Sequence, residues 1–273
     1  MMIPVDDKHT MLGFEGLMRF SPDIFHFVTT RQGGCSRGNY ASLNCTHYCG
    51  DDPKDVARNK ELLLQNFPIQ PVALLIPHQV HGTEVQRIEA GFAQLHVQQQ
   101  VELLEGVDAL VTDVPGVCLC VSTADCVPVL LYDLCRKVVA VAHAGWRGTV
   151  AGILSKTLGE MIAQYGCKPS NLWVGIGPSI SATSFEVGEE VYEAFQKAGF
   201  SMDKLAFRHS QTDKWHIDLW EANRLQALEA GVPQTQIEVA GICTYQHPEQ
   251  FFSARRLGIK SGRILTGIQL NFK

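Results

Sequence analysis

The strongest restriction on the fold comes from residues 122–148, STADCVPVLLYDLCRKVVAVAHAGWRG, where two apolar runs are separated by a few polar residues. Runs of this length that are rich in Val and Leu are typical of buried strands, and the short connection predicts an antiparallel hairpin. A turn at Leu134 and Cys135 would place Cys126 opposite His143. Directly opposed residues on one sheet face have Cβ atoms about 4.5 to 5.5 Å apart. The pattern therefore predicts a buried sheet with a cysteine and a histidine together at one end.

The rest of the chain alternates between further β-rich runs and helical patterns. The β-rich runs lie at 72–76, 107–112, 172–177 and 237–244. Apolar periodicity and capping residues predict helices at 149–165, 189–198 and 218–230, and a further helix that starts at Pro53. Strands and helices at unequal spacing indicate an α+β fold and not a regular parallel repeat. We therefore predict a single domain over 1–273, built of mixed β-sheets flanked by helices.

Composition excludes several classes of function. A formal net charge of -5 provides no basic field for binding nucleic acid or an anionic membrane. The N-terminal residues lack the basic stretch and apolar core of an export signal, and no run of about 18 apolar residues occurs. Nine cysteines, an odd number, indicate free thiols and not a disulfide framework in such a chain. We therefore expect a cytoplasmic protein that acts on a small molecule.

Three side chains around the predicted hairpin have the character of metal ligands. Cys126 and His143 stand at strand ends, and HQVHGTEV offers a second histidine, either His78 or His81. On a strand these two would point to opposite faces, so at most one can join the site, and spacing does not choose between them. One thiolate and two imidazoles suit Zn²⁺, with water as the fourth ligand of a catalytic centre. The plainer alternative is a buried cysteine and a strand-end histidine with structural roles.

Polar residues next to these strand ends extend the candidate site. Asp125 adjoins the cysteine, and Arg147 lies in GWRG, just before the helix expected at 149–165. A positive side chain beside the first amides of a helix is suited to an anionic ligand. The alternative for this arginine is an ion pair with a surface carboxylate.

A glycine-rich segment at 29–44, TTRQGGCSRGNYASLN, offers a second group of polar side chains. Its glycines permit a tight loop in which Arg31 and Asn44 would bind a polar ligand, although an ordinary surface turn accounts for the glycines equally well. The adjacent CTHYC at 45–49 has no second pair of ligand residues elsewhere in the chain, so we predict no structural zinc there.

Taken together, these segments resemble the YfiH family of laccase-domain proteins, also called the polyphenol oxidase or multicopper oxidase-like family. The motifs follow one another in the family's order: TRQGGCSRGNYASLN with GDD, QVHG, DALVT, TADCVPVLLYD, AVAHAGWRGTVAGI, IGPSISATSFEVGEEV, and FFSARR with GR. TADC with AHAGWRG is highly specific. The resemblance implies a compact α/β/β/α-like fold, and it selects His81, the histidine of QVHG, as the partner of Cys126 and His143 on Zn²⁺.

The resemblance also implies an activity on purine nucleosides. Its two parts are phosphorolysis of adenosine, inosine, guanosine and methylthioadenosine, and deamination of adenosine to inosine. For deamination, water activated at the metal would attack C6 of adenine while Asp125 protonates the departing amine. For phosphorolysis, arginines must hold a phosphate dianion, and the candidates are Arg31, Arg147 and Arg255. The chain departs from the family pattern at Ala254, where an aromatic residue is usual, so no stacking or hydroxyl contact is expected from that position.

Three other functions compete with this interpretation. A copper-dependent laccase needs paired histidines, and no His-x-His occurs among the ten histidines, so copper is less favoured than zinc. A metal-free cysteine hydrolase would use Cys126 as nucleophile and His143 as base, and a related fold occurs in the cytotoxic necrotizing factor toxins. A non-enzymatic scaffold is disfavoured because a buried thiol, imidazole and arginine at strand ends cost stability. The sequence makes no prediction about oligomeric state.

Overall fold

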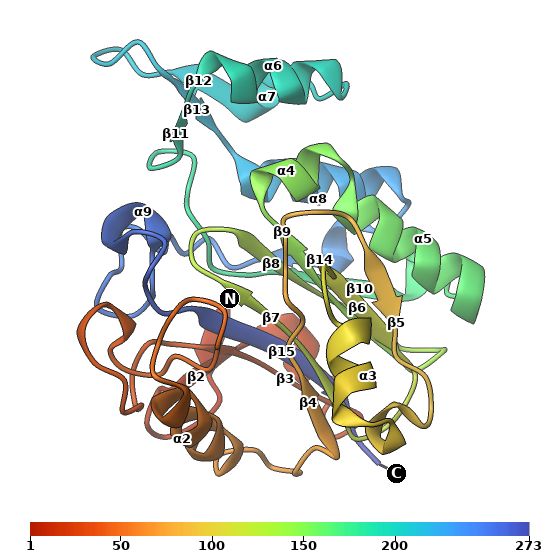
Figure 1. Ribbon diagram of the computed structural model, residues 1–273. Coiled ribbons are helices and arrows are strands. Elements are labelled where there is room, and N and C mark those ends of the chain that lie inside the picture. Colours follow the sequence, from red (N-terminus) through yellow and green to blue (C-terminus); the bar gives the residue numbers. More distant parts are fainter. Residues whose placement is uncertain (273) are drawn as a thin grey trace.

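Two six-stranded mixed sheets and one small sheet form the framework of the computed structural model, which describes residues 1–272 (Figure 1). The first sheet has the order β1-β2-β3-β15-β7-β4, with strands Met2–Pro4, Met11–Phe14, Ile24–Thr29, Ile264–Leu270, Val117–Thr123 and Ala73–Leu75. The second has the order β14-β10-β8-β9-β6-β5, with strands Ile237–Val239, Leu172–Ile176, Val127–Asp133, Val138–Ala144, Ala109–Thr112 and Val85–Arg87. The small sheet is β11-β13-β12, with strands Glu186–Val187, Trp215–Ile217 and Ala206–Arg208.

The helices lie outside the two large sheets or at their ends. They are α1 Glu15–Met18, α2 Pro53–Leu64, α3 Val97–Leu103, α4 Trp146–Val150, α5 Ile153–Tyr165, α6 Glu189–Lys197, α7 Met202–Leu205, α8 Leu219–Glu229 and α9 Ala254–Leu257. Figure 1 shows α6 and α7 beside the small sheet, apart from the two large ones. Short 3₁₀ helices of the described chain lie at Gly38–Tyr40, Phe92–Gln94, Pro169–Asn171 and Gln234–Gln236.

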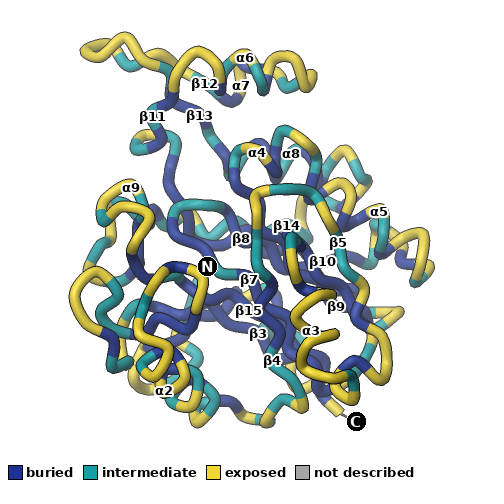
Figure 2. Tube along the Cα trace, in the orientation of Figure 1, coloured by how far each residue is buried: buried dark blue, intermediate teal, exposed yellow. Residues whose placement is uncertain are grey.

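Three apolar cores hold these layers together. The central core lies between the facing surfaces of the two large sheets, and the other two lie between each sheet and its outer helices, α2 on one side and α5 with α8 on the other. The inner strands of both large sheets are almost entirely buried, whereas exposed residues concentrate on the helices and loops (Figure 2). This order of helix, sheet, sheet and helix confirms the predicted mixed α+β fold.

Strand β7 shows why the sequence GVCLCVS suits the space between two cores. Val117, Leu119 and Val121 face the central core, and the alternate residues Cys118 and Cys120 face α2. Their Sγ atoms lie 3.7 Å apart in a fully buried environment. All nine cysteines lie within the described residues as free thiols.

The hairpin formed by β8 and β9 is present, but its predicted register is wrong. Pro128 and not Cys126 pairs with His143, and the strands close at Asp133 opposite Val138. The turn is therefore four residues long instead of two. Asp133 explains the longer turn, because its Oδ1 accepts hydrogen bonds of 2.8 Å from the amides of Cys135 and Arg136 within the turn. Cys126 consequently lies just outside the strand.

The helix predicted over 149–165 is also wrong in its extent. The structure has two helices, α4 and α5, joined at Gly152, whose φ of +79° interrupts the helical path. The helices expected from Pro53 and over 218–230 are present, and each has an aspartate cap. Asp52, which precedes Pro53, accepts a hydrogen bond from Lys54 N, and Asp218 accepts one from Glu221 N at the start of α8. The first part, α4, begins directly after the strand that carries His143, which brings the GWRG segment to the surface beside the site.

Within residues 1–272, no helix combines the length and apolar character that a membrane span requires. The cytoplasmic location and the single-domain organisation over 1–273 stay predictions from the sequence, and residue 273 lies outside the described residues.

Candidate metal centre

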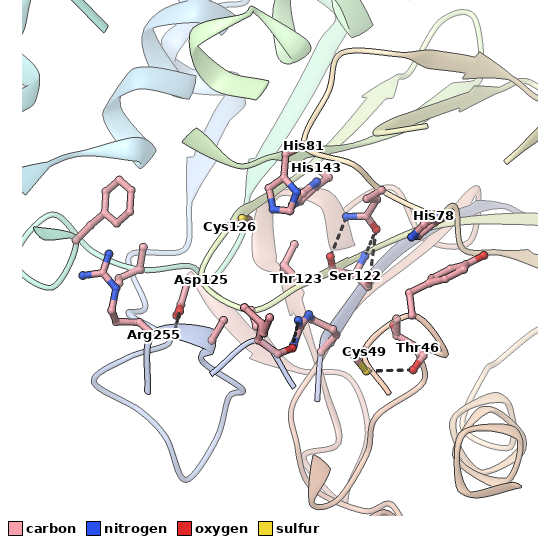
Figure 3. Close-up of a pocket in the computed structure, with 18 residues that line it drawn as sticks. Thr46, Cys49, His78, His81, Ser122, Thr123, Asp125, Cys126, His143 and Arg255 are labelled. Atoms are coloured by element: carbon pink, nitrogen blue, oxygen red, sulfur yellow. Dashed lines mark hydrogen bonds between the residues drawn. The ribbon is translucent and has the colours of Figure 1, made fainter. Parts of the chain in front are cut away.

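His81, Cys126 and His143 come together from three different elements. His81 lies in the loop between β4 and β5, Cys126 lies directly before β8, and His143 is near the end of β9. One donor atom from each residue lies within 4.8 Å of the other two, and the two imidazole rings meet edge to face with their centroids 4.8 Å apart (Figure 3). This is the only such group of ligand residues in the part of the chain that the structure describes. The cysteines and histidine of 45–49 form no comparable group.

Gly145 leaves the space in which these three side chains meet. A Cβ at this position would lie 2.9 Å from His81 Cδ2 and 3.0 Å from Cys126 Sγ, closer than carbon atoms normally approach. The glycine has an ordinary extended conformation, with φ of -64° and ψ of 166°. Its small size, and not its backbone freedom, is therefore what the site requires.

A fourth residue, Asp108, positions two of the three candidate ligands. Its Oδ1 lies 2.7 Å from His143 Nδ1, and its carboxylate accepts the amides of His81 at 3.0 Å and Gly82 at 2.7 Å. Because His143 donates through Nδ1, its Nε2 is left for a metal. Asp108 is fully buried, and these contacts lower its pKa although burial alone would raise it. In the sequence, Asp108 could have been recognised as an acid inside the apolar run VDALVT, because a buried acid needs a hydrogen-bonding or charged partner.

The cysteine and the histidine modify one another's charge. Burial raises the pKa of the Cys126 thiol, but the contacts with His143 and His81 outweigh it and lower that pKa to about 6. Burial lowers the pKa of His143, but Cys126 and Asp108 outweigh it and raise that pKa to about 9. The environment thus favours the thiolate, which is the form that binds metal ions and acts as a nucleophile.

The three residues lie in the wall of a cavity of about 530 Å³, which is within the usual range for small-molecule sites. The lining residues from the predicted site are His81, Asp125, Cys126, His143 and Arg255. The remaining lining residues are Thr46, Tyr48, Cys49, His78, Gln79, Ser122, Thr123, Ala124, Ile180, Phe185, Ala254, Ile259 and Arg263. Figure 3 shows Arg255 at one end of this group and His78 at the other, with the candidate ligands between them.

Both carboxylate oxygens of Asp125 are hydrogen-bonded within the protein. Oδ1 accepts from Thr244 Oγ1 at 2.7 Å, and Oδ2 accepts from Ser253 Oγ at 3.0 Å and from the amide of Arg255 at 2.7 Å. The residue has a positive φ of 83° at the turn before Cys126. Asp125 therefore fixes the segment that carries Arg255 beside the candidate ligands.

Three predicted substrate-binding residues are not among those that line the cavity. Arg31 donates through Nε to the carbonyl of Ala41 and through Nη1 to that of Pro248, at 2.7 Å in each case. Asn44 is fully buried and connects its own loop to the amide of Arg263. Arg147 is exposed, with its guanidinium over the ring of Trp146 at 4.3 Å. The glycine-rich loop of 29–44 is thus held by contacts of its own.

His78 has a place in the cavity wall but not among the candidate ligands. Its Nδ1 lies 2.6 Å from Glu105 Oε1, and its ring stacks on Tyr48 with centroids 4.3 Å apart. The grouping of donor atoms agrees with the selection of His81 over His78.

Fold and site together define a class of proteins with two packed sheets and a His-Cys-His centre in a cavity at the ends of the strands. The family model "Multi-copper polyphenol oxidoreductase laccase" matches residues 25–271. A purine nucleoside phosphorylase of Bacteroides thetaiotaomicron is 56% identical over 270 residues, 99% of this chain and all of the relative. Adenosine deaminase RL5, from an unknown prokaryotic organism, is 43% identical over 242 residues, 89% of this chain and 92% of the relative.

A solved structure gives the same result for the fold. The crystal structure of YlmD from Geobacillus stearothermophilus superposes with a TM-score of 0.86 at 33% identity, covering 98% of each chain. The chain belongs to the YfiH/YlmD family of laccase-domain proteins.

Proposed function

We propose that this protein is a zinc-dependent enzyme of purine nucleosides. It would phosphorolyse adenosine, inosine, guanosine and methylthioadenosine, and deaminate adenosine. The observation that carries the proposal is the group of His81, Cys126 and His143 in the wall of a cavity large enough for a nucleoside. Two relatives that match most of this chain, named as a purine nucleoside phosphorylase and an adenosine deaminase, support the choice of substrate class.

The donor set supports zinc as the metal. One thiolate and two imidazoles suit Zn²⁺, and three protein ligands leave a position open for water or substrate. The space that Gly145 leaves between the donors supports an ion there, because a Cβ would fill it. Zinc bound there would supply a Lewis acid that activates water for deamination. Copper is the less favoured alternative, since no His-x-His pair is present to build a copper cluster.

The chain's own residues divide the remaining tasks. Asp108 orients His143 and the loop of His81, so the donors are arranged before a metal arrives. Asp125 is the only carboxylate among the described residues that line the cavity, and we assign it the acid-base role in deamination. Arg255 also lines the cavity and carries positive charge for an anionic co-substrate. Arg31, Asn44 and Arg147 stay weaker candidates for substrate contact because none of them lines the cavity.

Metal content and activity test this proposal together. Single changes of His81, Cys126 or His143 to Ala should each remove bound zinc, and removal of zinc by a chelator should abolish phosphorolysis and deamination until Zn²⁺ is added back. His78→Ala is the matched control, because its ring lies in the same wall but outside the donor group; it should retain a full equivalent of zinc. Retention of zinc by the Cys126→Ala protein would refute the assignment.

A second candidate function, a metal-free cysteine hydrolase, is favoured by one observation. The pKa of the Cys126 thiol is lowered to about 6 beside a histidine, as a cysteine nucleophile requires. The two functions give opposite results in a metal-free sample. A hydrolase would keep its activity after chelation and lose it on alkylation of Cys126, whereas the zinc enzyme would already be inactive.

A further inference from the structure

The backbone of His81 has a conformation that residues other than glycine rarely adopt. Its φ is +62°, in the left-handed region, where the Cβ of an ordinary residue comes too close to the backbone. Such a conformation persists only where the surrounding structure holds it in place. Asp108 provides one restraint, because its carboxylate accepts the amides of residues 80–82 at 2.7 to 3.3 Å.

The side chain of Gln79, two residues before His81, provides a second restraint. Its Oε1 accepts the amide of Ser122 at 2.7 Å and the Ser122 hydroxyl at 3.1 Å, and its Nε2 donates to the Ser122 carbonyl at 2.9 Å (Figure 3). The orientation of the Gln79 amide is therefore unambiguous, because a backbone N–H only donates and a carbonyl only accepts. One side-chain amide thus pairs with both backbone groups of Ser122.

This amide pair takes the place of a missing strand. Strand β4 pairs with β7 only as far as Leu75 opposite Leu119, so it does not reach Ser122 near the end of β7. On its other edge Ser122 is paired with Leu265 of β15, which fixes it within the first sheet. The contact with Gln79 consequently attaches the loop of His81 to a firmly held strand end.

The attachment links two of the candidate ligands that Asp108 does not connect. Ser122 lies four residues before Cys126, on the strand that leads to it, whereas Asp108 connects the loop of His81 to His143. The remaining pair, Cys126 and His143, is linked by the pairing of β8 with β9. Each pair of candidate ligands therefore has a connection of its own.

We propose that Gln79 is a positioning residue of the candidate metal centre and that its pairing with Ser122 keeps His81 in place. This assignment rests on the zinc-dependent function proposed above. Without the pairing, Asp108 alone would restrain the loop, and His81 could relax to a negative φ that turns its imidazole away from the other two donors. Loss of a group that orients a metal ligand typically lowers metal affinity about 10- to 100-fold.

Gln79→Met tests the proposal, because methionine keeps the length of the side chain and removes both hydrogen-bonding groups. The zinc affinity, measured by competition with a chelator of known Kd, should fall about 10- to 100-fold. The visible spectrum of the Co²⁺-substituted protein should also change, since its bands depend on the arrangement of the ligands. A residue that only stabilises the fold would lower the urea midpoint and leave both of these measurements unchanged.

Ser122→Ala is the matched control. It removes the hydroxyl and keeps the backbone amide and carbonyl with which Gln79 pairs, so it should retain the zinc affinity of the unmodified protein. Unchanged zinc affinity in the Gln79→Met protein would overturn the proposal. An equal loss of affinity in both variants would also overturn it, because the hydroxyl and not the amide pair would then hold the loop.

Hydrogen exchange of the metal-free protein tests the restraint without zinc. The amides of His81 and Gly82 should exchange about tenfold faster in the Gln79→Met protein, as expected when the loss of one attachment makes local opening easier. Unchanged exchange would show that Asp108 is sufficient and would overturn the proposal. Faster exchange in a protein whose unmodified form binds no zinc would refute the proposed function and leave the restraint standing.

Discussion

At the scale of single residues, Asp108 shows how a side chain outside the cavity arranges the candidate metal centre. One buried carboxylate accepts a hydrogen bond from His143 Nδ1 and from three amides of the loop that carries His81. Its buried charge is compensated by these donors, which stabilise the ionised form. Two ligands from distant parts of the chain therefore have their positions fixed by the same group.

Gly145→Ala should remove the metal while leaving the fold intact. The added methyl group would lie 3.0 Å from Cys126 Sγ, so the thiolate and His81 would be pushed apart, although the backbone conformation suits alanine. We expect less than a tenth of the normal zinc content by elemental analysis and an unchanged circular dichroism spectrum. The control is Gly159→Ala in α5, where an added Cβ meets nothing within 4 Å; it should keep its zinc. Normal zinc content in the Gly145→Ala protein would show that the donors do not converge there.

His26 should make the protein less stable in mild acid. It is 3% exposed in β3, its Nε2 accepts the amide of Phe14, and burial lowers its pKa from 6.5 to about 4. The unfolded chain therefore binds this proton at higher pH than the folded one does. The contribution to stability is complete above about pH 6.5 and falls by up to about 3 kcal/mol as the pH decreases to about 4.

Urea unfolding at pH 7 and pH 5 measures this effect, with His26→Gln as the reference, because its amide oxygen can still accept the Phe14 hydrogen bond. The loss of unfolding free energy between the two pH values should be smaller in the variant. Equal losses in both proteins would mean that His26 does not take part.

The residues of the site differ in how far the sequence reveals them. Cys126 and His143 are visible because a thiol and an imidazole at the ends of two adjacent apolar runs indicate a shared site, and the family resemblance was needed to choose His81. Thr46, Thr123 and Arg263 also line the cavity but were missed, because a threonine or arginine has no distinctive local pattern and the fold brings these residues together from distant parts of the chain. Arg31 and Arg147 were suggested by glycines and a helix start, which do not determine where a long side chain points.

At the scale of elements, periodicity predicted which segments form strands and helices better than it predicted how they join. The hairpin of β8 and β9 was expected from two apolar runs, but its register depended on Asp133, whose carboxylate stabilises a four-residue turn. Similarly, the apolar pattern at 149–165 continues across Gly152, although the backbone changes direction there. Both errors arise where two elements join, because a polar side chain or the backbone conformation of a glycine decides the geometry there. The spacing of apolar residues reports neither effect.

Gly152→Ala should destabilise the junction between α4 and α5. Its φ of +79° is unfavourable for a residue with a Cβ, while the nearest atom to that Cβ would be at an ordinary 3.9 Å. We expect the free energy of unfolding to fall by about 1 to 2 kcal/mol in denaturant titrations. Gly159→Ala, inside α5, should instead raise it by about 0.5 to 1 kcal/mol. A gain of stability at Gly152 would indicate that one continuous helix is accessible after all.

At the scale of the whole molecule, the candidate metal centre lies where the two large sheets are joined. Cys126 lies in the connection from β7 of the first sheet to β8 of the second, and His81 lies in the connection from β4 to β5, which also passes from one sheet to the other. His143 belongs to the second sheet. An ion bound by all three would therefore link these two crossings to the second sheet.

Zinc should raise the melting temperature of the metal-free protein. A ligand that binds only the folded state at a hundred times its Kd stabilises that state by about 2.7 kcal/mol, which corresponds to about 5 to 10 °C for a chain of this size. Differential scanning calorimetry with and without Zn²⁺ measures the shift. The Cys126→Ala protein should show no rise, and an equal rise in that variant would mean that zinc stabilises the molecule elsewhere.

Strand β15 also determines the order in which the molecule can assemble during synthesis. It lies between β3 and β7 in the first sheet, yet it is the last strand in the chain. Until β15 has been made, β3 and β7 have no strand between them, whereas all six strands of the second sheet precede β15 in the chain. The second sheet can thus form first on the nascent chain, and the cavity wall that contains Arg263 and Thr123 closes only once β15 has been made.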